Sequence, residues 1–375
     1  MPHISHAAYG RPGATGYVTR AVIAASAMCA MHIARTITGM AEKIRWGVLG
    51  AANIAVEKVI PAMQRGSKTE VVAIASLRQE RGRAAALKLG IERVHDSYEA
   101  LLADPGVDAI YNPLPNHLHV PWSIRAAEAG KHVLCEKPIG LNADEARSLL
   151  AVRDRTGVVI GEAFMARSHP QWLRAREIAQ SGAIGDLRVV TGTFTYFNRD
   201  PDNVRNIRGI GGGGLYDIGC YPITTSRMVF GEEPTRVLGL LEDDPDFGVD
   251  RLASVILDYP SGHASFTCST QLVPYQRMHL MGTTGRVEIE IPFNAPNDVP
   301  CRILIDDGES LHGDTIRVEE FPVLDQYTVQ GDLFAEAIRT GGPAPTPLEE
   351  AVRNMEVIDA VFRSATSGHW ESPAA

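Results

Sequence analysis

The chain has 375 residues, of which 45% are hydrophobic and 22% charged, and its formal net charge is −9. This composition is that of a globular protein long enough for two domains, and the negative charge argues against a nucleic-acid partner. No apolar stretch is long enough to cross a bilayer, so we expect no membrane partner. The five cysteines are scattered without metal-ligand spacing, which predicts no metal site and favours a reducing, cytoplasmic location.

Residues 1–40 lack the pattern of a packed element. An apolar stretch, Ala21–Met31, follows Arg11 and Arg20, so a cleaved secretory signal is one interpretation. The other is a dispensable extension or a misassigned start, because Met40 lies directly before the first expected strand. We favour the second interpretation and expect a chain that starts at Met40 to fold.

Residues 41–163 alternate between strand and helix patterns, which is typical of a parallel sheet with crossover helices. The expected strands are Ile44–Leu49, Glu70–Ser76, Val107–Asn112, Lys131–Cys135 and Val158–Glu162. The expected helices between them are Val56–Met63, Arg81–Leu89, Ser97–Leu102, Pro121–Ala129 and Ala143–Thr156, the last capped by Asn142. We therefore assign 41–163 to a Rossmann dinucleotide-binding domain.

The pattern changes after Phe164, and residues 164–366 predict a second α/β domain with an open, mostly antiparallel sheet, followed by a tail at 367–375. Asp186–Phe197 alternates polar and apolar residues as a half-buried strand does. Further strands are expected at Arg236–Leu241, Ala253–Asp258, Ala264–Cys268, Arg277–Gly282 and Arg286–Ile291, with turns at Tyr259–Gly262 and Thr283–Gly285. Helices are expected at Leu215–Phe230, Gly331–Thr340 and Leu348–Ala365.

The turn after the first strand has the form of a dinucleotide-binding loop. Gly50, Ala51, Ala52, Asn53 and Ile54 separate the strand from a helix, the arrangement that holds a pyrophosphate on backbone N–H groups. Ala52 and Ala55 replace the second and third glycines of the G-x-G-x-x-G motif. A strand, turn and helix without a ligand is the alternative for this segment taken alone.

The end of the second strand distinguishes NAD from NADP. An acidic residue at this place binds the 2′-hydroxyl of NAD, but this chain has Ser76, Leu77 and Arg78 instead. A hydroxyl and a guanidinium suit a 2′-phosphate, so we expect NADP as the cofactor. The alternative for Arg78 is a solvated surface side chain.

Two more loops follow strand ends at the same edge of the expected sheet. The segment Ala109–His119, AIYNPLPNHLH, contains two prolines that stiffen a loop where ligands bind in α/β folds. Cys135–Pro138, CEKP, places Lys137 where its ammonium can reach the cleft. A solvated lysine in a turn is the alternative when this segment is taken alone.

Taken together, GAANIA, PLPNHLH and CEKP resemble the glucose–fructose oxidoreductase/inositol dehydrogenase/MocA family. GEAFMARSHPQW (Gly161–Trp172) and GGGGLYDIGCY (Gly211–Tyr221) extend the resemblance, which covers Ile44 to about Phe362. It is strongest toward D-xylose 1-dehydrogenase, dihydrodiol dehydrogenase and the sugar oxidoreductases. The resemblance implies that the nicotinamide lies between the two domains and that the second sheet pairs subunits into a homodimer or homotetramer.

The resemblance also implies roles for individual residues. Lys137, Asp217 and Tyr221 match the family's catalytic lysine and D-x-G-x-[HY] pair, and all three would touch the substrate, as would His169 and Arg205. The cofactor would also contact Leu114, Pro115, Asn116, His119, Glu136, Lys137, Arg167 and Tyr327. We expect Tyr221 to act as the general base, because a nearby cation favours the phenolate and lowers the pKa of a tyrosine.

These observations predict an NADP-dependent enzyme that oxidises an aldose at C1 to the lactone by hydride transfer. Three alternatives share the same residues. The chain could transfer hydride between two aldoses with tightly bound NADP, oxidise trans-dihydrodiols, or bind a sugar and NADP without catalysis as a regulator. The intact Lys137, Asp217 and Tyr221 argue against the regulator.

Overall fold

The computed structural model describes residues 42–373. Our expectations for residues 1–40 lie outside the described residues, as does the last part of the tail. Within residues 42–373, none of the helices combines the length and the apolar character that a bilayer crossing requires.

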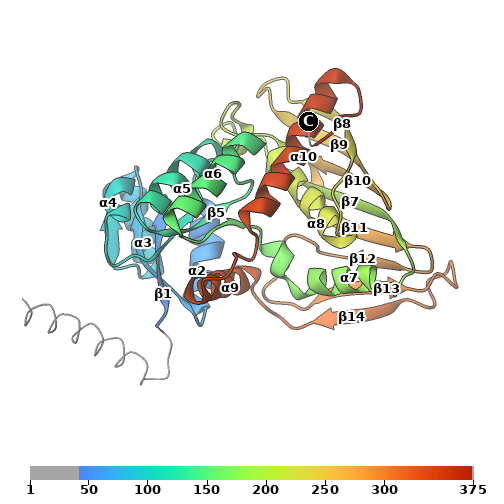
Figure 1. Ribbon diagram of the computed structural model, residues 1–375, viewed down its shortest axis with the longest axis horizontal. Coiled ribbons are helices and arrows are strands. Elements are labelled where there is room, and N and C mark those ends of the chain that lie inside the picture. Colours follow the sequence, from blue (N-terminus) through green and yellow to red (C-terminus); the bar gives the residue numbers. More distant parts are fainter. Residues whose placement is uncertain (1–41, 374–375) are drawn as a thin grey trace, which may run out of the picture. The chain divides into compact units, whose positions relative to one another are not determined.

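The first sheet consists of six parallel strands in the order β3-β2-β1-β4-β5-β6 (Figure 1). The strands are β1 (Ile44–Leu49), β2 (Thr69–Ala75), β3 (Arg93–His95), β4 (Ala109–Asn112), β5 (His132–Glu136) and β6 (Ile160–Ala163). The strand order reverses between β1 and β4, and ligands of α/β sheets bind at the carboxyl ends of strands beside such a point. The expected Rossmann fold is therefore confirmed, with β3 as a strand that we did not predict.

Five α-helices accompany the strands of the first sheet: α2 (Ile60–Arg65), α3 (Gln79–Leu89), α4 (Tyr98–Leu102), α5 (His119–Glu128) and α6 (Ala143–Thr156). A π-helical turn, η1 (Ala55–Val59), precedes α2, and a 3-10 turn, η2 (Asn116–Leu118), precedes α5. The side chain of Asn142 accepts a hydrogen bond from the Glu145 N–H and caps α6, as expected.

The second sheet has eight strands in the order β14-β13-β12-β11-β7-β10-β9-β8. They are β7 (Leu187–Phe197), β8 (Arg236–Asp243), β9 (Asp250–Tyr259), β10 (Gly262–Ser269), β11 (Gln271–Gly282), β12 (Arg286–Ile289), β13 (Cys301–Asp306) and β14 (Arg317–Phe321). Each pair is antiparallel except β7 with β10. The predicted mostly antiparallel sheet and both predicted turns are confirmed. We did not predict β13 and β14, whose side chains are largely half-buried or exposed.

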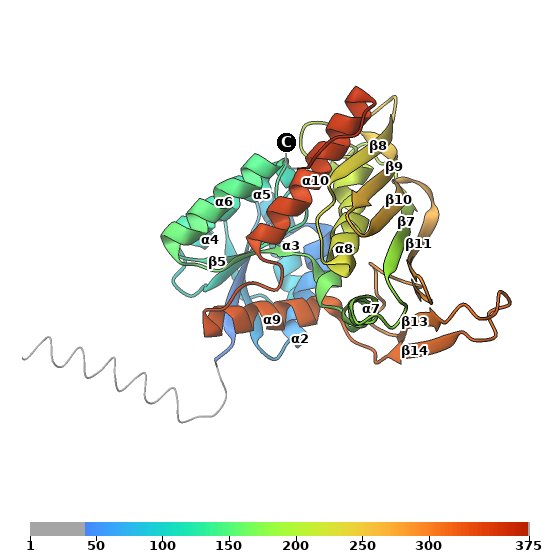
Figure 2. The same ribbon diagram turned by 45° about the vertical axis from the view of Figure 1, so that its right-hand side comes forward.

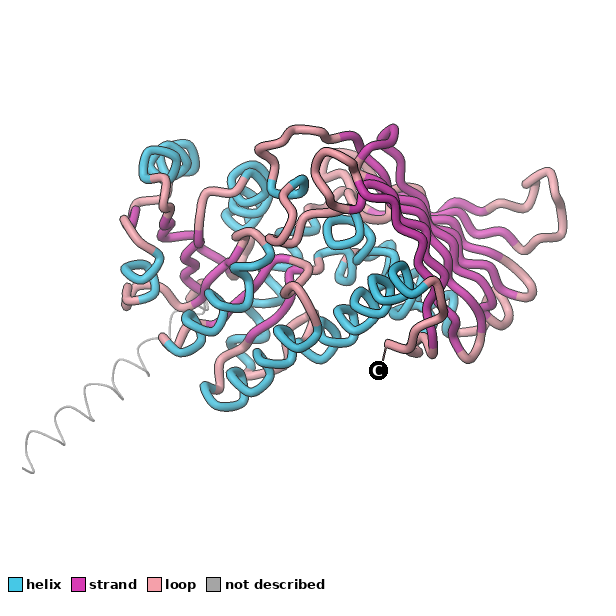
Figure 3. The backbone as a smooth tube through the Cα atoms, turned by 90° about the horizontal axis from the view of Figure 1, so that it is seen from above, coloured by secondary structure: helices cyan, strands magenta, loops and turns pink. Residues whose placement is uncertain are grey.

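The second part of the chain, which follows β6, has the helices α7 (Pro170–Gln180), α8 (Cys220–Phe230), α9 (Gln326–Thr340) and α10 (Leu348–Ser367). Of these, α9 contacts α2 and β2 of the first part. Short turns lie at η3 (Met165–Ser168), η4 (Val204–Asn206) and η5 (Leu215–Gly219). Figure 2 shows α8 and α10 beside the second sheet, and Figure 3 shows that helices line one face of that sheet. Helix α10 also contacts α6 of the first part. We did not predict α7; His169 caps it and Pro170 occupies its first turn.

One apolar core joins the two sheets. It contains Leu49 and Val133 from the first sheet, Val190 and Phe194 from β7, and Met355 from α10. Burial of this continuous apolar surface opposes separation of the two sheets. The loops at the carboxyl ends of the first sheet are therefore held against the second part of the chain.

Candidate functional site

The expected site residues lie in loops that follow the carboxyl ends of β1, β2, β4, β5 and β6, or on segments packed against those loops. Gly50–Ile54 follow β1, Ser76 and Arg78 follow β2, Leu114–Asn116 follow β4, and Lys137 follows β5. The other segments are the chain from Arg205 to Tyr221 and the start of α9 at Tyr327. A parallel sheet brings its strand ends to one edge, so the fold gathers residues that are distant in sequence.

The β1 loop has the geometry that a dinucleotide requires. Gly50 has φ +83°, and a Cβ added there would lie 3.1 Å from Leu114 Cδ2. Its N–H donates to the Ala75 carbonyl at 2.6 Å, which fixes the turn at the switch point. Ala51 is buried and Asn53 is exposed. Small side chains therefore leave the backbone open to a phosphate where the helix begins, so the residues present fit a dinucleotide.

Two guanidinium groups lie near the end of β2. Arg78 is exposed before α3, and Ser76 is buried against Gly82, where an added Cβ would lie 2.9 Å from the Ser76 Cβ. Arg81 donates to the Asn53 side chain at 2.6 Å and so contacts the β1 loop. Sequence reasoning missed Arg81. Its position three residues after Arg78, in the first turn of the expected helix, was the available signal.

The β4 loop contacts both the β5 loop and the glycine run Gly211–Gly214. His119 is 1% exposed, with Nδ1 2.8 Å from the Pro138 carbonyl and Nε2 2.6 Å from the Leu114 carbonyl. Burial lowers the pKa of His119 to about 4. The side chain of Asn116 donates to the Gly211 carbonyl at 2.9 Å. His119 thus joins two loops from inside the protein instead of presenting its ring to the cleft.

An ionic cluster surrounds Asp217, in which the side chains of Lys137 and Asp217 are largely buried and that of Arg205 is 41% exposed. Lys137 Nζ lies 3.5 Å from Asp217 Oδ1 and donates to the Asp217 carbonyl at 2.5 Å. Arg205 Nε lies 2.9 Å from Oδ2, and the Tyr196 hydroxyl donates to Oδ2 at 2.6 Å. Burial alone would raise the pKa of Asp217, but Arg205, Lys137 and Tyr196 together lower it to about 2. Asp217 is therefore an ionised anchor and a poor proton acceptor.

Tyr196 was not among the residues that we expected in the site. It lies on β7, whose alternating pattern reports only which residues face the core. The sequence offered no sign that this hydroxyl would meet the carboxylate of Asp217.

The structure contradicts our expectation for the pKa of Tyr221. Lys137 Nζ lies over the ring face, 4.7 Å from its centroid, instead of beside the hydroxyl. The hydroxyl donates to Met165 Sδ at 3.7 Å, and the residue is 5% exposed. Burial raises the pKa well above its ordinary value, and Tyr327 and Cys220 add to this effect. The expected lowering by Lys137 was wrong, because removal of a phenolate from water costs more than a cation over the ring restores.

Glu136 and Tyr327 lie beside this cluster. The Tyr111 hydroxyl donates to Glu136 Oε1 at 2.7 Å, and burial raises the pKa of Glu136. Tyr327 packs against the apolar cores on both sides of the first sheet. Burial and the neighbouring Glu136 raise the pKa of Tyr327, so Tyr221 and Tyr327 are both neutral at ordinary pH.

Arg167 and His169 point elsewhere. Arg167 pairs with Glu350 at 3.2 Å and donates to Thr224 at 3.2 Å. It lines a hollow of about 420 Å³ with residues of α7 and α9. His169 is 1% exposed, and its Nδ1 accepts the Gln171 N–H at 3.3 Å. Within residues 42–373 neither forms a hydrogen bond or ion pair with Lys137 or Tyr221.

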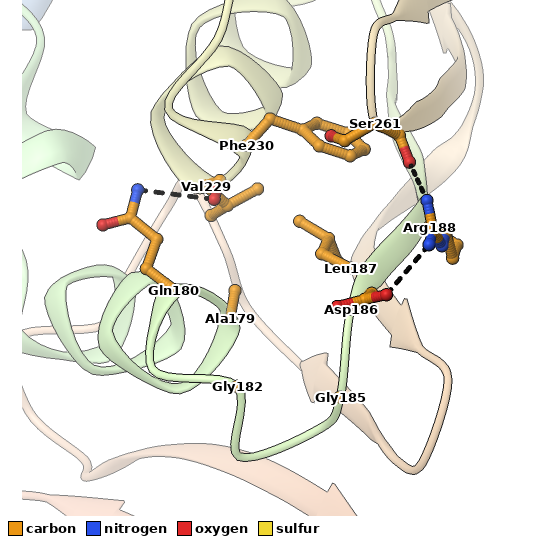
Figure 4. Close-up of a pocket in the computed structure, with 10 residues that line it drawn as sticks. All are labelled: Ala179, Gln180, Gly182, Gly185, Asp186, Leu187, Arg188, Val229, Phe230 and Ser261. Atoms are coloured by element: carbon orange, nitrogen blue, oxygen red, sulfur yellow. Dashed lines mark hydrogen bonds and ion pairs between the residues drawn. The ribbon is translucent and has the colours of Figure 1, made fainter.

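A separate hollow of about 410 Å³ lies among the end of α7, the start of β7 and the end of α8 (Figure 4). It is lined by Gln180, Leu187, Arg188, Phe230, Ser261 and five neighbours, none of which is an expected site residue. Arg188 donates to the Ser261 carbonyl and pairs with Asp186, as Figure 4 shows. These groups satisfy one another, so the hollow does not compete with the site at Lys137.

Comparison with known families agrees with this arrangement. Residues 44–164 match the oxidoreductase family with an NAD-binding Rossmann fold, and residues 172–288 match the GFO/IDH/MocA C-terminal domain. The chain belongs to the Gfo/Idh/MocA family. It is therefore an oxidoreductase of this family with a Rossmann dinucleotide-binding domain.

Several relatives match nearly their whole length. An uncharacterised oxidoreductase of Rhizobium meliloti is 48% identical over 332 residues, which cover 88% of this chain and 99% of the relative. D-xylose 1-dehydrogenase (NADP+) 2 of Haloferax volcanii is 39% identical over 328 residues, covering 86% and 98%. The structure resembles the 3-ketoreductase KijD10 of Actinomadura kijaniata in complex with NADP and TDP-benzene, with a TM-score of 0.80, 31% identity, and coverage of 86% and 98%.

Glu162 is a further buried carboxyl group beside the Lys137 loop. It is 2% exposed, and its Oε1 accepts the Ile139 N–H at 2.9 Å. Its Oε2 has no hydrogen-bond partner within residues 42–373. Burial raises the pKa of Glu162 to about 7, although the Ile139 N–H, Arg167 and Lys137 oppose this shift.

Replacement of Glu162 by glutamine should change how stability depends on pH. Glu162 in the folded wild type keeps its proton up to about pH 7, whereas in the unfolded chain it loses the proton near pH 4.5. The raised pKa therefore contributes stability that is fully present below pH 4.5 and is lost as the pH rises through about 7. The free energy of unfolding of wild type relative to Glu162→Gln should fall by about 1–3 kcal/mol between pH of about 5 and 8. Urea unfolding across this range measures the difference, and a constant difference would contradict the prediction.

Proposed function

We propose that this protein is an NADP-dependent sugar oxidoreductase that oxidises an aldose at C1 to the lactone. The observation that carries the proposal is the Lys137–Asp217–Arg205 cluster beside Tyr221, at the edge of the sheet that presents the dinucleotide loop. A sugar needs several fixed donors and acceptors, which this cluster offers. The 39% identity to a D-xylose 1-dehydrogenase supports an aldose substrate.

Each residue of the cluster has a role in this proposal. A bound nicotinamide supplies the hydride acceptor, and the chain supplies position and proton transfer. Lys137 donates a hydrogen bond to the reacting sugar oxygen, and Asp217, held by Arg205 and Tyr196, fixes the lysine. In the oxidation direction Tyr221 must react as the phenolate, which accepts the proton of that oxygen as hydride leaves C1, and in the reverse direction neutral Tyr221 donates the proton.

The positions of the variants of the similar ketoreductase support the choice of Lys137 and Tyr221. Its solved structures include a tyrosine-to-phenylalanine variant and two variants of a lysine, which is replaced by alanine or glutamate. The numbering of those variants separates the lysine and the tyrosine by the same distance along the chain as Lys137 and Tyr221. We infer that the two pairs correspond.

A second function, reduction of a keto sugar with NADPH, is favoured by one observation. Burial raises the pKa of Tyr221, and a neutral tyrosine is ready to donate a proton to a developing alkoxide. A panel separates the two functions: aldoses and dihydrodiols with NADP, and keto sugars with NADPH, followed at the absorbance of reduced nicotinamide. Turnover of keto sugars without aldose oxidation would reject the C1 dehydrogenase, and no turnover of any class would reject both.

We also propose that the second sheet pairs two copies of the chain. Its face turned away from α8 and α10 carries the exposed side chains of Leu240, Ile256, Tyr275 and Met281 among serines and threonines. An exposed apolar surface of this kind is typical of an interface. Light scattering in solution tests this proposal, and a monomer at all concentrations would reject it.

Arg78→Ala should weaken NADP binding and leave NAD binding nearly unchanged. Loss of a guanidinium–phosphate pair should cost about ten- to a hundredfold in the Kd for NADP. Arg83→Ala is the matched control, because Arg83 is also exposed on α3 but reaches toward Asp96 at 3.8 Å. Fluorescence titration with both reduced cofactors measures the affinities, and equal losses for both would contradict the assignment of Arg78.

Tyr221→Phe keeps the packing of the ring and removes the proton-exchanging group. We expect turnover to fall about 10²–10⁴-fold while cofactor binding stays nearly intact. Lys137→Ala should cost a similar factor, and the double variant little more, because groups that act as one unit are not additive. Single-turnover kinetics and cofactor titration provide the measurements. Penalties that multiply in the double variant, or ordinary turnover by Tyr221→Phe, would place the proton transfer elsewhere.

A further inference from the structure

The helix that carries Asp217 and Tyr221 has no capping side chain of its own. It begins at η5 after Gly214, and no side chain at that position accepts a hydrogen bond from the first turn. The N–H groups of a first helical turn need acceptors when they are buried. The acceptor here comes from a distant strand: Asp250 at the start of β9 accepts the Leu215 N–H through Oδ2 at 2.6 Å.

The glycine run is shaped to receive this carboxylate. Gly213 has φ +115°, and a Cβ added there would lie 2.0 Å from Asp250 Oδ1. A Cβ at Gly214 would lie 3.4 Å from Oδ2. Asp250 can therefore approach the start of the helix only because residue 213 has no side chain.

The same turn also holds Arg205. The Gly213 N–H donates to the Arg205 carbonyl at 2.8 Å, and the Arg205 side chain pairs with Asp217 two residues after Leu215. Asp250 therefore contacts the turn at residues 213–215, which is hydrogen-bonded to the backbone of Arg205 and leads directly into Asp217. A displacement of this turn moves the arginine, the aspartate and the following Tyr221 together.

Asp250 is 4% exposed, and no arginine or lysine of residues 42–373 pairs with it. The titratable groups that influence it or are influenced by it are Asp243 on β8, Tyr216 on η5 and Cys268 on β10. Burial raises the pKa of Asp250 to about 7, although the N–H groups of Leu215 and Gly214, at the positive end of the helix, oppose this shift.

We propose that Asp250 is a positioning residue, whose carboxylate fixes the first turn of the helix that carries Asp217 and Tyr221. The inference rests on the function proposed above for those two residues. Asp250 itself touches neither substrate nor cofactor. It acts through its hydrogen bond with the Leu215 N–H and its contact with the glycine run. Its loss makes the first turn of the helix more mobile, so Asp217 and Tyr221 are held less precisely.

Hydrogen exchange tests the proposal without any substrate. In Asp250→Ala, peptides covering residues 213–221 should exchange about tenfold faster than in wild type, as expected for loss of a helix cap. Peptides of α3 and α6 should keep their rates. Asp250→Asn retains an accepting oxygen and should show a clearly smaller increase. Asp306→Asn is the matched control, since Asp306 is an equally buried carboxylate on β13 that pairs with Arg286, and it should leave 213–221 unchanged.

Gly213→Ala gives an independent test of the same contact. Its Cβ would displace the carboxylate and would also strain the backbone at φ +115°. The part of its effect that disappears when Asp250→Ala is already present reports the contact with the carboxylate. Unchanged exchange at 213–221 in Asp250→Ala, or an equal increase along the whole chain, would overturn the proposal.

Kinetics then test the link to function. With a substrate from the panel, Asp250→Ala should lower kcat about tenfold or more with little change in the KM for the cofactor, and Asp250→Asn should restore most of it. Normal kcat in Asp250→Ala despite faster local exchange would overturn the positioning role. If the panel yields no substrate, the proposed function fails while the exchange experiment still decides whether Asp250 holds the helix.

Discussion

The pairing of one buried carboxylate constrains the rest of the site. The Asp217 side chain is only 13% exposed, so much of its hydration is lost and protein groups must balance its charge. Lys137 comes from the end of β5 in the first sheet, while Arg205 and Tyr196 come from the second part of the chain. Because donors from both parts meet on one carboxylate, the cluster specifies how the Lys137 loop lies against η5. Burial of the continuous apolar core holds the two sheets together. The pairing of Asp217 fixes the position of the Lys137 loop relative to η5.

The glycine run Gly211–Gly214 also fixes the position of Asp217, because it leads into the turn that carries this residue. Its members pack against Asn116 of the β4 loop on one side and Asp250 of β9 on the other. Pro222 has no N–H, so it cannot donate the α-helical hydrogen bond that the Ile218 carbonyl would otherwise accept. The helix changes here to the wider π-helical turn η5. Asp217 therefore lies in a first turn whose geometry depends on its neighbours. Local sequence preference alone would not produce this shape.

The sequence predicted what depends on periodicity and on strand ends. The alternation from Ile44 to Glu162 was sufficient for the Rossmann sheet apart from β3. Its strand ends located the loops that carry Gly50, Arg78 and Lys137, whose roles stay predictions. Contacts between distant segments could not be predicted, which is why Tyr196 and Asp250 were missed, whereas the position of Arg81 beside Arg78 was a signal that we did not use. The pKa of Tyr221 was predicted wrongly for the same reason. A sequence can indicate that a lysine is near, but it does not show that the lysine lies over the ring or that the hydroxyl is buried.

The orientation of Tyr221 bears on how the proposed chemistry would begin. Its hydroxyl has only a weak sulfur acceptor, Met165, so the described structure offers no strong partner for its proton. In the reduction direction, a developing alkoxide beside Lys137 would be a better acceptor, and the same ammonium would stabilise it. In the oxidation direction, Tyr221 must lose its own proton before it can accept the proton of the sugar hydroxyl. Burial disfavours the phenolate until such an oxygen arrives, so proton exchange would be coupled to substrate binding. Because Asp217 stays ionised and paired, it holds Lys137 as a donor without competing for the proton. Tyr221 would therefore act only when a substrate oxygen binds beside it. Without substrate, burial keeps the Tyr221 hydroxyl protonated.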